Sequence, residues 1–349
     1  GQSINLGKFR IEFIKTNHSI QDASALAIYS PAGIVVHTGD FKVDYTPVFG
    51  DAIDLQRFAE IGKKGVLALM SDSTNAERPG FTQSERTVGA TFDRLFAEHS
   101  NTRIIVATFA SNVDRVQQII NTSYKYGRKV VVEGRSMVNI ISVASELGYL
   151  NVPENTLIET DQLKNYPREK TTIITTGSQG ESMAALSRMA ADIHKKISIM
   201  PGDTIILSSN PIPGNEKAVS NIINELSEKG ANVIFQDTHV SGHACQEELK
   251  LIYSLVKPKY AIPVHGEYRH LKANAGIAKS LGIPKDNIFI LKSGDVLALD
   301  DESAEVLDKV HTGEILVDGL GVGDVGNIVL RDRQHLAEDG ILIVVLTLE

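Results

Sequence analysis

The stretch RIIVATFASNVDRVQQIINTSYKYGRKVVVEG, from Arg103 to Gly134, places an apolar strand-like run, an amphipathic helix-like run and a second apolar run in succession. Short runs rich in Ile and Val favour buried β-strands, and apolar residues spaced by three or four favour a helix. The alternation continues through apolar runs that begin near Thr171, Asp203 and Asn232. Five such runs with helices between them predict a doubly wound parallel α/β domain over residues 84–236.

The sequence on both sides of this domain has a different pattern. Residues 1–83 contain four short runs with polar ends, FRIEFIKT, SALAIYS, GIVVHTGD and VLALMSDS. Residues 237–311 contain KYAIPVHGE, a predicted helix from about Tyr268 to Leu281, and a hairpin expected between NIFILK and DVLALD around Ser293 and Gly294. We therefore expect residues 1–83 and 237–311 to form one domain that residues 84–236 interrupt. Residues 312–349 are interpreted as a linker and the start of a truncated C-terminal domain.

Composition restricts the class of protein. A single cysteine, Cys245, excludes an internal disulfide framework and suits a reducing compartment. No apolar run reaches the roughly 18 to 20 residues of a membrane helix, and no signal peptide is recognisable, so we expect a cytoplasmic protein without a membrane partner. The net charge of −8 argues against general attraction to nucleic acid, so any such site must be local. The absence of an initial Met and the final run ILIVVLTLE lead us to expect that both ends are cut.

Three candidate metal ligands follow apolar runs directly: His18 in FIKTNHS, Asp40 in VVHTGD and His265 in AIPVHGE. Imidazole with carboxylate suits zinc or manganese at a hydrolytic site, where a metal-bound water would attack a phosphodiester. We expect these side chains to converge within about 5 Å of one another. The alternative for each residue is an ordinary turn or hydrogen-bonding role at a strand end.

Three turns are candidate phosphate-binding sites. FAS at Phe109 to Ser111 and GSQGE at Gly177 to Glu181 each end an apolar run and are expected to open a helix, and HVSGH at His239 to His243 precedes a helix starting near Cys245. Free N–H groups at a helix N-terminus favour anions, although such turns are more often simple caps. Three of them around one domain cleft favour an RNA-phosphate pocket. We interpret His37 and Cys245 as structural, and Arg115, Arg135 and Arg188 as surface residues.

Five motifs occur in a recognisable order. They are His18 with Ser19 and Asp22, TGDFK at Asp40, SDSTN at Asp72, HVSGH at His243 and PVHGE at His265, with the α/β domain between SDSTN and HVSGH. Over essentially its whole length the chain resembles the β-CASP family of metallo-β-lactamase-fold nucleases, and within it ribonuclease J. The resemblance implies an αββα sandwich interrupted by a doubly wound β-CASP domain, with substrate in the cleft between them.

The resemblance also implies roles for individual residues. His18 would bind one metal, His265 a second, and Asp40 would bridge the two. Asp72 would orient a ligand or catalytic group, and His243 would contact the scissile phosphate or leaving group. The substrate contacts expected from the turns and the resemblance are Phe109, Ala110, Ser111, Ser178, His239, Val240, Ser241, Gly242 and His243. Two divalent ions would be the cofactors, Zn²⁺ first, with Mn²⁺ or Mg²⁺ as alternatives.

The implied activity is hydrolysis of single-stranded RNA, both 5′-to-3′ exonucleolytic and endonucleolytic, in mRNA turnover and rRNA maturation, by a homodimer or homotetramer. One departure from the family is serious, because its His-x-His-x-Asp-His motif is absent from this sequence. Missing upstream sequence is the simplest account, and we expect the chain as given to be an incomplete and inactive fragment. Two alternatives stay open: a non-catalytic RNA-binding or scaffold subunit of an RNA-degradation complex, and a small-molecule metallo-hydrolase.

Overall fold

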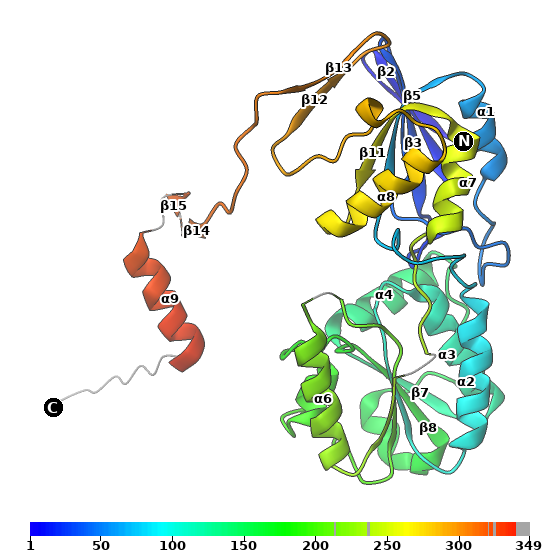
Figure 1. Cartoon of the computed structure of the whole chain (residues 1–349). Coiled ribbons are helices and arrows are strands. Elements are labelled where there is room, and N and C mark those ends of the chain that lie inside the picture. Colours follow the sequence, from blue (N-terminus) through cyan, green and yellow to red (C-terminus); the bar gives the residue numbers. More distant parts are fainter. Residues whose placement is uncertain (213, 236–237, 320, 324–325, 340–349) are drawn as a thin grey trace. The chain divides into compact units, whose positions relative to one another are not determined.

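The computed structural model describes residues 1–212, 214–235, 238–319, 321–323 and 326–339. It divides into two units, one of Gly1–Leu291 with Asp300–Ser303 and one of Lys292–Leu299 with Ala304–Glu349. The first unit contains both large sheets (Figure 1). All the candidate site residues belong to it as well. Among the described residues, no helix is long and apolar enough to cross a membrane.

The first sheet has six strands in the order β1-β2-β3-β4-β5-β11. These are β1 Ser3–Leu6, β2 Phe9–Lys15, β3 Ser24–Ser30, β4 Gly33–His37, β5 Val66–Asp72 and β11 Pro258–Val264. Neighbours are antiparallel from β1 to β4 and parallel from β4 through β5 to β11. Because β2 and β4 are each antiparallel to β3, they run in the same direction. The carboxyl ends of β2, β4, β5 and β11 therefore share one edge.

Alternate residues of these strands face two different environments. Ile14, Val36 and Leu69 are fully buried against the helices α1 Leu55–Gly62, α7 Gln246–Val256 and α8 Tyr268–Ser280. On β2, the residues that point to the opposite face, Phe9 and Phe13, are 48% and 38% exposed. A strand with apolar residues on both faces is typical of a sheet covered on both sides. The described part of the first unit thus contains one sheet and one helical layer of the expected sandwich.

The second sheet has five strands in the order β10-β9-β6-β8-β7, and every pairing is parallel. The strands are β6 Ile104–Ala107, β7 Lys129–Glu133, β8 Thr171–Thr175, β9 Thr204–Leu207 and β10 Asn232–Ile234. Helices α2 Arg86–Glu98, α3 Val113–Lys125 and α4 Arg135–Glu146 pack on one face, and α5 Ala185–Ala190 and α6 Glu216–Glu228 pack on the other. The predicted α/β fold with a doubly wound parallel sheet is confirmed. Short 3₁₀ helices lie at Thr160–Asn165, Arg168–Lys170 and Lys285–Asn287.

The hairpin predicted around Ser293 and Gly294 is wrong. DVLALD does form a strand, β12 Val296–Leu299, but it pairs with β13 Ala304–Leu307. Asp300 sets the turn, because its side chain accepts hydrogen bonds from the N–H groups of Glu302 and Ser303. NIFILK contributes only an isolated bridge between Ile288 and Ala261.

The described residues after Thr312 form the short pair β14 Val317–Asp318 and β15 Gly321–Val322, followed by the helix α9 Asn327–Asp339. The sequence patterns did not predict this helix. The final run ILIVVLTLE lies outside the described residues.

Candidate metal centre

The candidate ligands lie in the loops at the shared carboxyl edge of the six-stranded sheet. His18 follows β2, Asp40 follows β4, Asp72 ends β5 and His265 follows β11. The register aligns Val264 with Asp72, so the ends of β5 and β11 are level. Parallel strands in register deliver their next residues to one place, which explains how such distant sequence positions meet.

Two of the three expected approaches are measured, and both involve Asp40. Asp40 Oδ2 lies 3.8 Å from His18 Nε2 and 3.5 Å from His265 Nε2. Ligand atoms of Asp40, Asp72, His243 and His265 all lie within 4.8 Å of one another. Asp40 therefore faces His18 and His265 at once, as a shared ligand must. Their assignment as metal ligands stays a proposal.

His18 is oriented by a backbone carbonyl. Its Nδ1 lies 2.9 Å from the carbonyl oxygen of Gly242, which can only accept, so Nδ1 carries the proton and Nε2 presents a lone pair towards Asp40. Burial lowers the pKa of His18 and keeps the ring neutral, the form that binds metals. A side chain at Gly242 would collide with His18 and Ser19, since a Cβ there would lie 2.5 Å from His18 Nδ1. The absence of a side chain at Gly242 therefore allows its backbone to lie close to His18 and Ser19.

His265 holds an uncommon backbone conformation, with φ of 55° at the end of β11. Its carbonyl accepts a hydrogen bond from the N–H of Ser73 at 3.2 Å, which joins the ends of β11 and β5. A left-handed residue with a side chain costs on the order of 1 kcal/mol, and such strain concentrates at functional sites. The ring is 55% exposed and free to bind a ligand.

Asp72 makes contacts through both of its carboxylate oxygens. Its Oδ1 accepts from the N–H and hydroxyl of Thr74, which forms an Asx turn, and its Oδ2 lies 2.7 Å from His243 Nδ1. Burial alone would raise the pKa of Asp72, but the hydrogen bonds from His243 and Thr74 lower it overall. Burial opposes charge on His243 too, yet Asp72 raises its pKa overall. Asp72 is buried and His243 half-buried, and the His243 ring contacts those of both His18 and His265.

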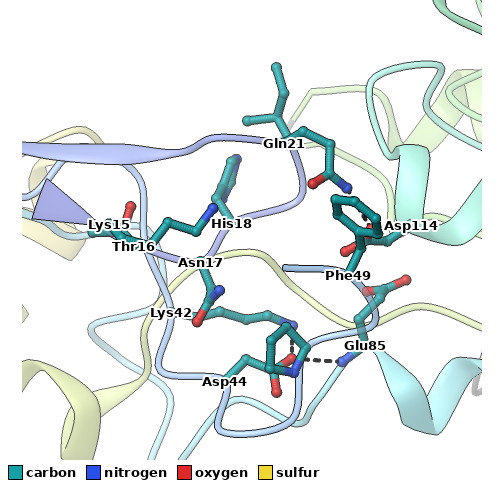
Figure 2. A pocket seen from close by; sticks show the side chains of 12 residues that line it. Lys15, Thr16, Asn17, His18, Gln21, Lys42, Asp44, Phe49, Glu85 and Asp114 are labelled. Atoms are coloured by element: carbon teal, nitrogen blue, oxygen red, sulfur yellow. Dashed lines mark hydrogen bonds and ion pairs between the residues drawn. The ribbon is translucent and has the colours of Figure 1, made fainter. Parts of the chain in front are cut away.

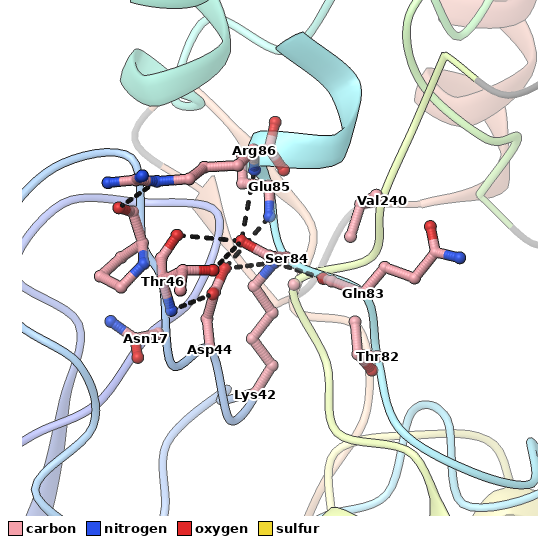
Figure 3. A network of polar contacts seen from close by, with 12 residues as sticks. Asn17, Lys42, Asp44, Thr46, Thr82, Gln83, Ser84, Glu85, Arg86 and Val240 are labelled. Atoms are coloured by element: carbon pink, nitrogen blue, oxygen red, sulfur yellow. Dashed lines mark hydrogen bonds and ion pairs between the residues drawn. The ribbon is translucent and has the colours of Figure 1, made fainter. Parts of the chain in front are cut away.

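The loop after Asp40 is anchored by buried polar groups rather than by apolar packing alone. Lys42 and Asp44 are each 3% exposed and pair at 3.5 Å. Asp44 also accepts hydrogen bonds from the N–H groups of Thr46 and Glu85, and Lys42 donates to the carbonyl of Gln83 (Figure 3). The segment that enters the second sheet is thereby attached to the loop that carries Asp40.

The loop after His18 contacts helix α3 of the second sheet. Gln21 donates to Asp114 at 2.5 Å, and both line a space of about 20 Å³ together with His18 and Glu85 (Figure 2). Burial, with the like charge of Glu85, raises the pKa of Asp114 to about 6 despite the bond from Gln21. His37 Nδ1 accepts the N–H of Gly39 at 2.9 Å, and its structural interpretation stays a prediction.

The HVSGH segment forms a candidate phosphate loop beside the metal ligands. Ser241 Oγ accepts from Asn75 and from the N–H of His243, which ties HVSGH to SDSTN. His239, Val240 and Ser241 line a cavity of about 180 Å³. Its other lining residues are Asn75, Arg78, Phe81, Thr82, Gln83 and Cys245. Arg78 brings a guanidinium that the sequence analysis did not single out.

The remaining predicted contacts fare differently. Phe109, Ala110 and Ser111 lie at the start of α3 but do not line this cavity, and their role stays a prediction. Ser178 is 2% exposed, in a turn packed on the loop after β9, so the structure gives its assignment no support. GSQGE does not open a helix directly, since α5 begins only at Ala185.

The structure supports the interpretation of Cys245 and contradicts that of Arg115. Cys245 is buried as the N-cap of α7, and burial raises the pKa of its thiol, which fits the structural interpretation. Arg115 was expected on the surface, and this is wrong, because its side chain is fully buried against Glu85. Arg135 and Arg188 line a separate cavity of about 620 Å³ with the Glu133–His194 pair.

Two family models match the chain. The model described as "Ribonuclease J, beta-CASP domain" matches residues 101–226, and "Zn-dependent metallo-hydrolase RNA specificity domain" matches residues 230–286. Imidazole and carboxylate side chains at one edge fit divalent-metal coordination by the chemistry of their donor atoms. Together these findings define the class as a metallo-hydrolase of the metallo-β-lactamase type with a β-CASP insertion.

Relatives narrow the class. Ribonuclease J 1 of Streptococcus pyogenes is 50% identical over 97% of this chain and 61% of its own length. Ribonuclease J2 of Bacillus subtilis is 48% identical over 97% and 61%, and Ribonuclease J of Thermus thermophilus is 45% identical over 98% and 60%. The chain is similar to members of the ribonuclease J family over nearly its whole length, and it spans about three fifths of the length of these relatives. A crystal structure of a protein of unknown function from Enterococcus faecalis, with a TM-score of 0.59 and 18% identity over 88% of this chain and 66% of its own, shares the fold.

Proposed function

We propose that the protein is a metal-dependent ribonuclease that hydrolyses phosphodiester bonds of single-stranded RNA. The observation that carries the proposal is the placement of the Asp72–His243 pair against Asp40 and His265, with ligand atoms within 4.8 Å. A single phosphodiester can reach all these groups at once. The neighbouring HVSGH cavity and the match to an RNA specificity domain favour a polynucleotide over a small ester.

His18, Asp40 and His265 would hold two divalent ions, with Asp40 shared between them. Zn²⁺ is the first candidate, given the imidazole ligands, and Mn²⁺ or Mg²⁺ are the alternatives. When bound, such ions supply a nucleophilic water near neutral pH and neutralise phosphate charge.

His243 and Asp72 would act on the scissile phosphate. Asp72 Oδ2 bonds to His243 Nδ1, which fixes the ring and leaves Nε2 for the phosphate or the leaving oxygen. The logic is that of a carboxylate that orients a catalytic imidazole. Thr74 in turn fixes Asp72, so the pair does not depend on substrate for its geometry.

The broader role follows the resemblance to the family. We infer 5′-to-3′ exonuclease and endonuclease action in mRNA turnover and rRNA maturation, in the cytoplasm, by a homodimer or homotetramer of the whole protein. The deciding experiment uses the full-length protein, with metal analysis and cleavage of 5′-monophosphorylated, end-labelled RNA. We expect bound divalent metal and chelator-sensitive release of nucleotides. A metal-loaded protein that binds this RNA without cleaving it would instead support the non-catalytic alternative.

A further inference from the structure

Arg115 is the largest of the fully buried side chains among the described residues. Its Nε and Nη2 each donate to one carboxylate oxygen of Glu85 at 2.8 Å, a bidentate pair. Nη1 donates to the carbonyl of Ser208 at 2.7 Å, and Nη2 to that of Val240 at 3.3 Å. Nη1 also lies 2.8 Å from Nδ1 of His239. A buried guanidinium is tolerated when its donors are satisfied in this way.

The partners of Arg115 come from both segments that connect the two sheets. Glu85 lies where the chain enters the second sheet, and His239 with Val240 lies where it returns (Figure 3 labels Glu85 and Val240). Arg115 itself belongs to α3, inside the second domain. The side chain of Arg115 therefore attaches the HVSGH segment to the inserted α/β domain, which precedes this segment in the sequence.

The contact with His239 determines where the imidazole carries its proton. A guanidinium N–H only donates, so Nδ1 of His239 must present a lone pair. The single proton of the neutral ring then lies on Nε2. Burial, followed by the charges of Arg115, Lys42 and Arg78, lowers the pKa of His239 to about 3, so the ring stays neutral.

We propose that Arg115 is a positioning residue that holds His239 as the neutral Nε2–H tautomer, so that the HVSGH cavity offers a hydrogen-bond donor to a phosphate oxygen. The role of the donor rests on the proposed function, whereas the tautomer does not. His239 is then neither a general base at Nδ1 nor a cation, and the positive charge of the cavity comes from Arg78. This separates His239 from His243, which is bonded to a carboxylate through the same ring atom.

The first test is nitrogen NMR of the histidine rings in the ¹⁵N-labelled 349-residue chain. The His239 signals are assigned as those lost in His239→Asn. We expect a neutral ring with the proton on Nε2 at pH about 7, where an unperturbed histidine would also be largely neutral but free to exchange tautomers. A ring protonated on Nδ1, or a mixture of both tautomers, would overturn the proposal. This measurement requires neither metal nor activity.

The second test uses Arg115→Lys, which keeps the charge beside Glu85 but cannot reach His239 and two carbonyls at once. We expect His239 to exchange between tautomers and the affinity for adenosine 5′-monophosphate to fall about tenfold, the loss of one good hydrogen bond to an anion. Arg128→Lys is the matched control. Arg128 is also buried, at 3% exposure, and donates to the carbonyls of Thr102, Thr171 and His99.

The control separates positioning from general stability. Arg128→Lys should lower stability without changing the His239 signals or the nucleotide affinity. Equal effects of the two variants on both readouts would overturn the proposal. If Arg115→Lys does not fold, the spectrum of the unsubstituted chain decides the tautomer alone. If the unsubstituted chain binds no adenosine 5′-monophosphate, the phosphate cavity of the proposed function fails, while the spectrum still decides the role of Arg115.

Discussion

The carboxyl edges of the two sheets share a geometry and differ in content. At the six-stranded sheet, the loops after β4 and β11 carry Asp40 and His265, and β5 ends at Asp72, all with ligand atoms within 4.8 Å. At the five-stranded sheet, the loops after β6 and β8 carry FAS and GSQGE, with small side chains such as the buried Ser178. Parallel strands bring their ends together in both cases. From the residue types we propose that chemistry belongs to the first edge, and support of the substrate loop to the second.

The prediction with the largest expected effect tests whether the carboxyl edge of the six-stranded sheet carries enough metal ligands for a hydrolytic site. A hydrolytic zinc needs about three protein ligands, and two ions need more than His18, Asp40 and His265 provide. We expect the 349-residue chain to bind divalent metal weakly and to show no RNA turnover. A longer protein that supplies the further metal ligands should gain both, as measured by metal content and cleavage of labelled RNA. Robust chelator-sensitive cleavage by the short chain would mean that further residues, such as Asp72 or His37, complete the site.

The second prediction compares one residue from the carboxyl edge of each sheet in the full-length enzyme. His243→Ala should lower kcat by about 10²- to 10⁴-fold, because a group at the leaving oxygen acts mainly in the transition state. RNA affinity should change little. Ser178→Ala, at the second edge, should leave both constants within about twofold, because its buried side chain does not line the phosphate cavity. Steady-state kinetics that rank Ser178→Ala with His243→Ala would remove the distinction between the edges.

A smaller effect concerns a carboxylate at the start of α3 that we do not regard as a ligand. The pKa of Asp114 is raised to about 6, so the folded state favours the protonated form and the wild-type chain loses stability as pH rises from about 4 to about 6. Asp114→Asn should remove this loss and raise the free energy of unfolding at pH 7 by at most about 3 kcal/mol. Urea unfolding at several pH values measures it.

Asp93→Asn is the control for this change, because Lys125 lowers the pKa of Asp93 through a surface ion pair. It should bring no gain in stability at pH 7. An Asp114→Asn variant that follows the pH dependence of the wild type would show that the carboxyl is not held protonated.

The smallest effect is expected at the phosphate loop of the full-length enzyme. Ser241 accepts hydrogen bonds from Asn75 and from the backbone of His243, and its own proton is available to a phosphate. Ser241→Ala should therefore weaken RNA binding by up to about tenfold and leave kcat nearly unchanged. An effect on kcat as large as that of His243→Ala would contradict the division of roles between the two residues.

The features that depend on local sequence patterns could be predicted. Short apolar runs predicted every strand of the two large sheets except β1, and residues at strand ends predicted that His18 and His265 lie close to Asp40. The hairpin was misplaced because the side chain of Asp300 builds a turn that outweighs the Ser-Gly pair. GSQGE forms an irregular turn rather than the expected helix start, because Gly177 and Gly180 take positive φ before α5 begins.

Arg115 shows why other features could not be predicted from the sequence. On a helix, an arginine followed by two glutamines favours a solvated surface, and nothing nearby signals its partners. Glu85 precedes it by 30 positions and His239 follows it by 124. The carbonyl of Gly242 that orients His18 lies 224 positions away. Such contacts depend on how the two domains pack, which periodicity does not reveal.

The position of β11 also sets an order of events during synthesis. Strand β5 pairs with β11 in register from Val66 and Pro258, so about 190 residues must be made before β5 gains this neighbour. At roughly 5 to 20 residues per second, the wait is on the order of 10 to 40 s. The apolar edge VLALM of β5 is open throughout, while the inserted domain, whose strands follow one another closely, can complete its own sheet. The inserted domain can therefore be complete while the domain that it interrupts is unfinished, and during that interval the unpaired edge of β5 is open to intermolecular strand pairing.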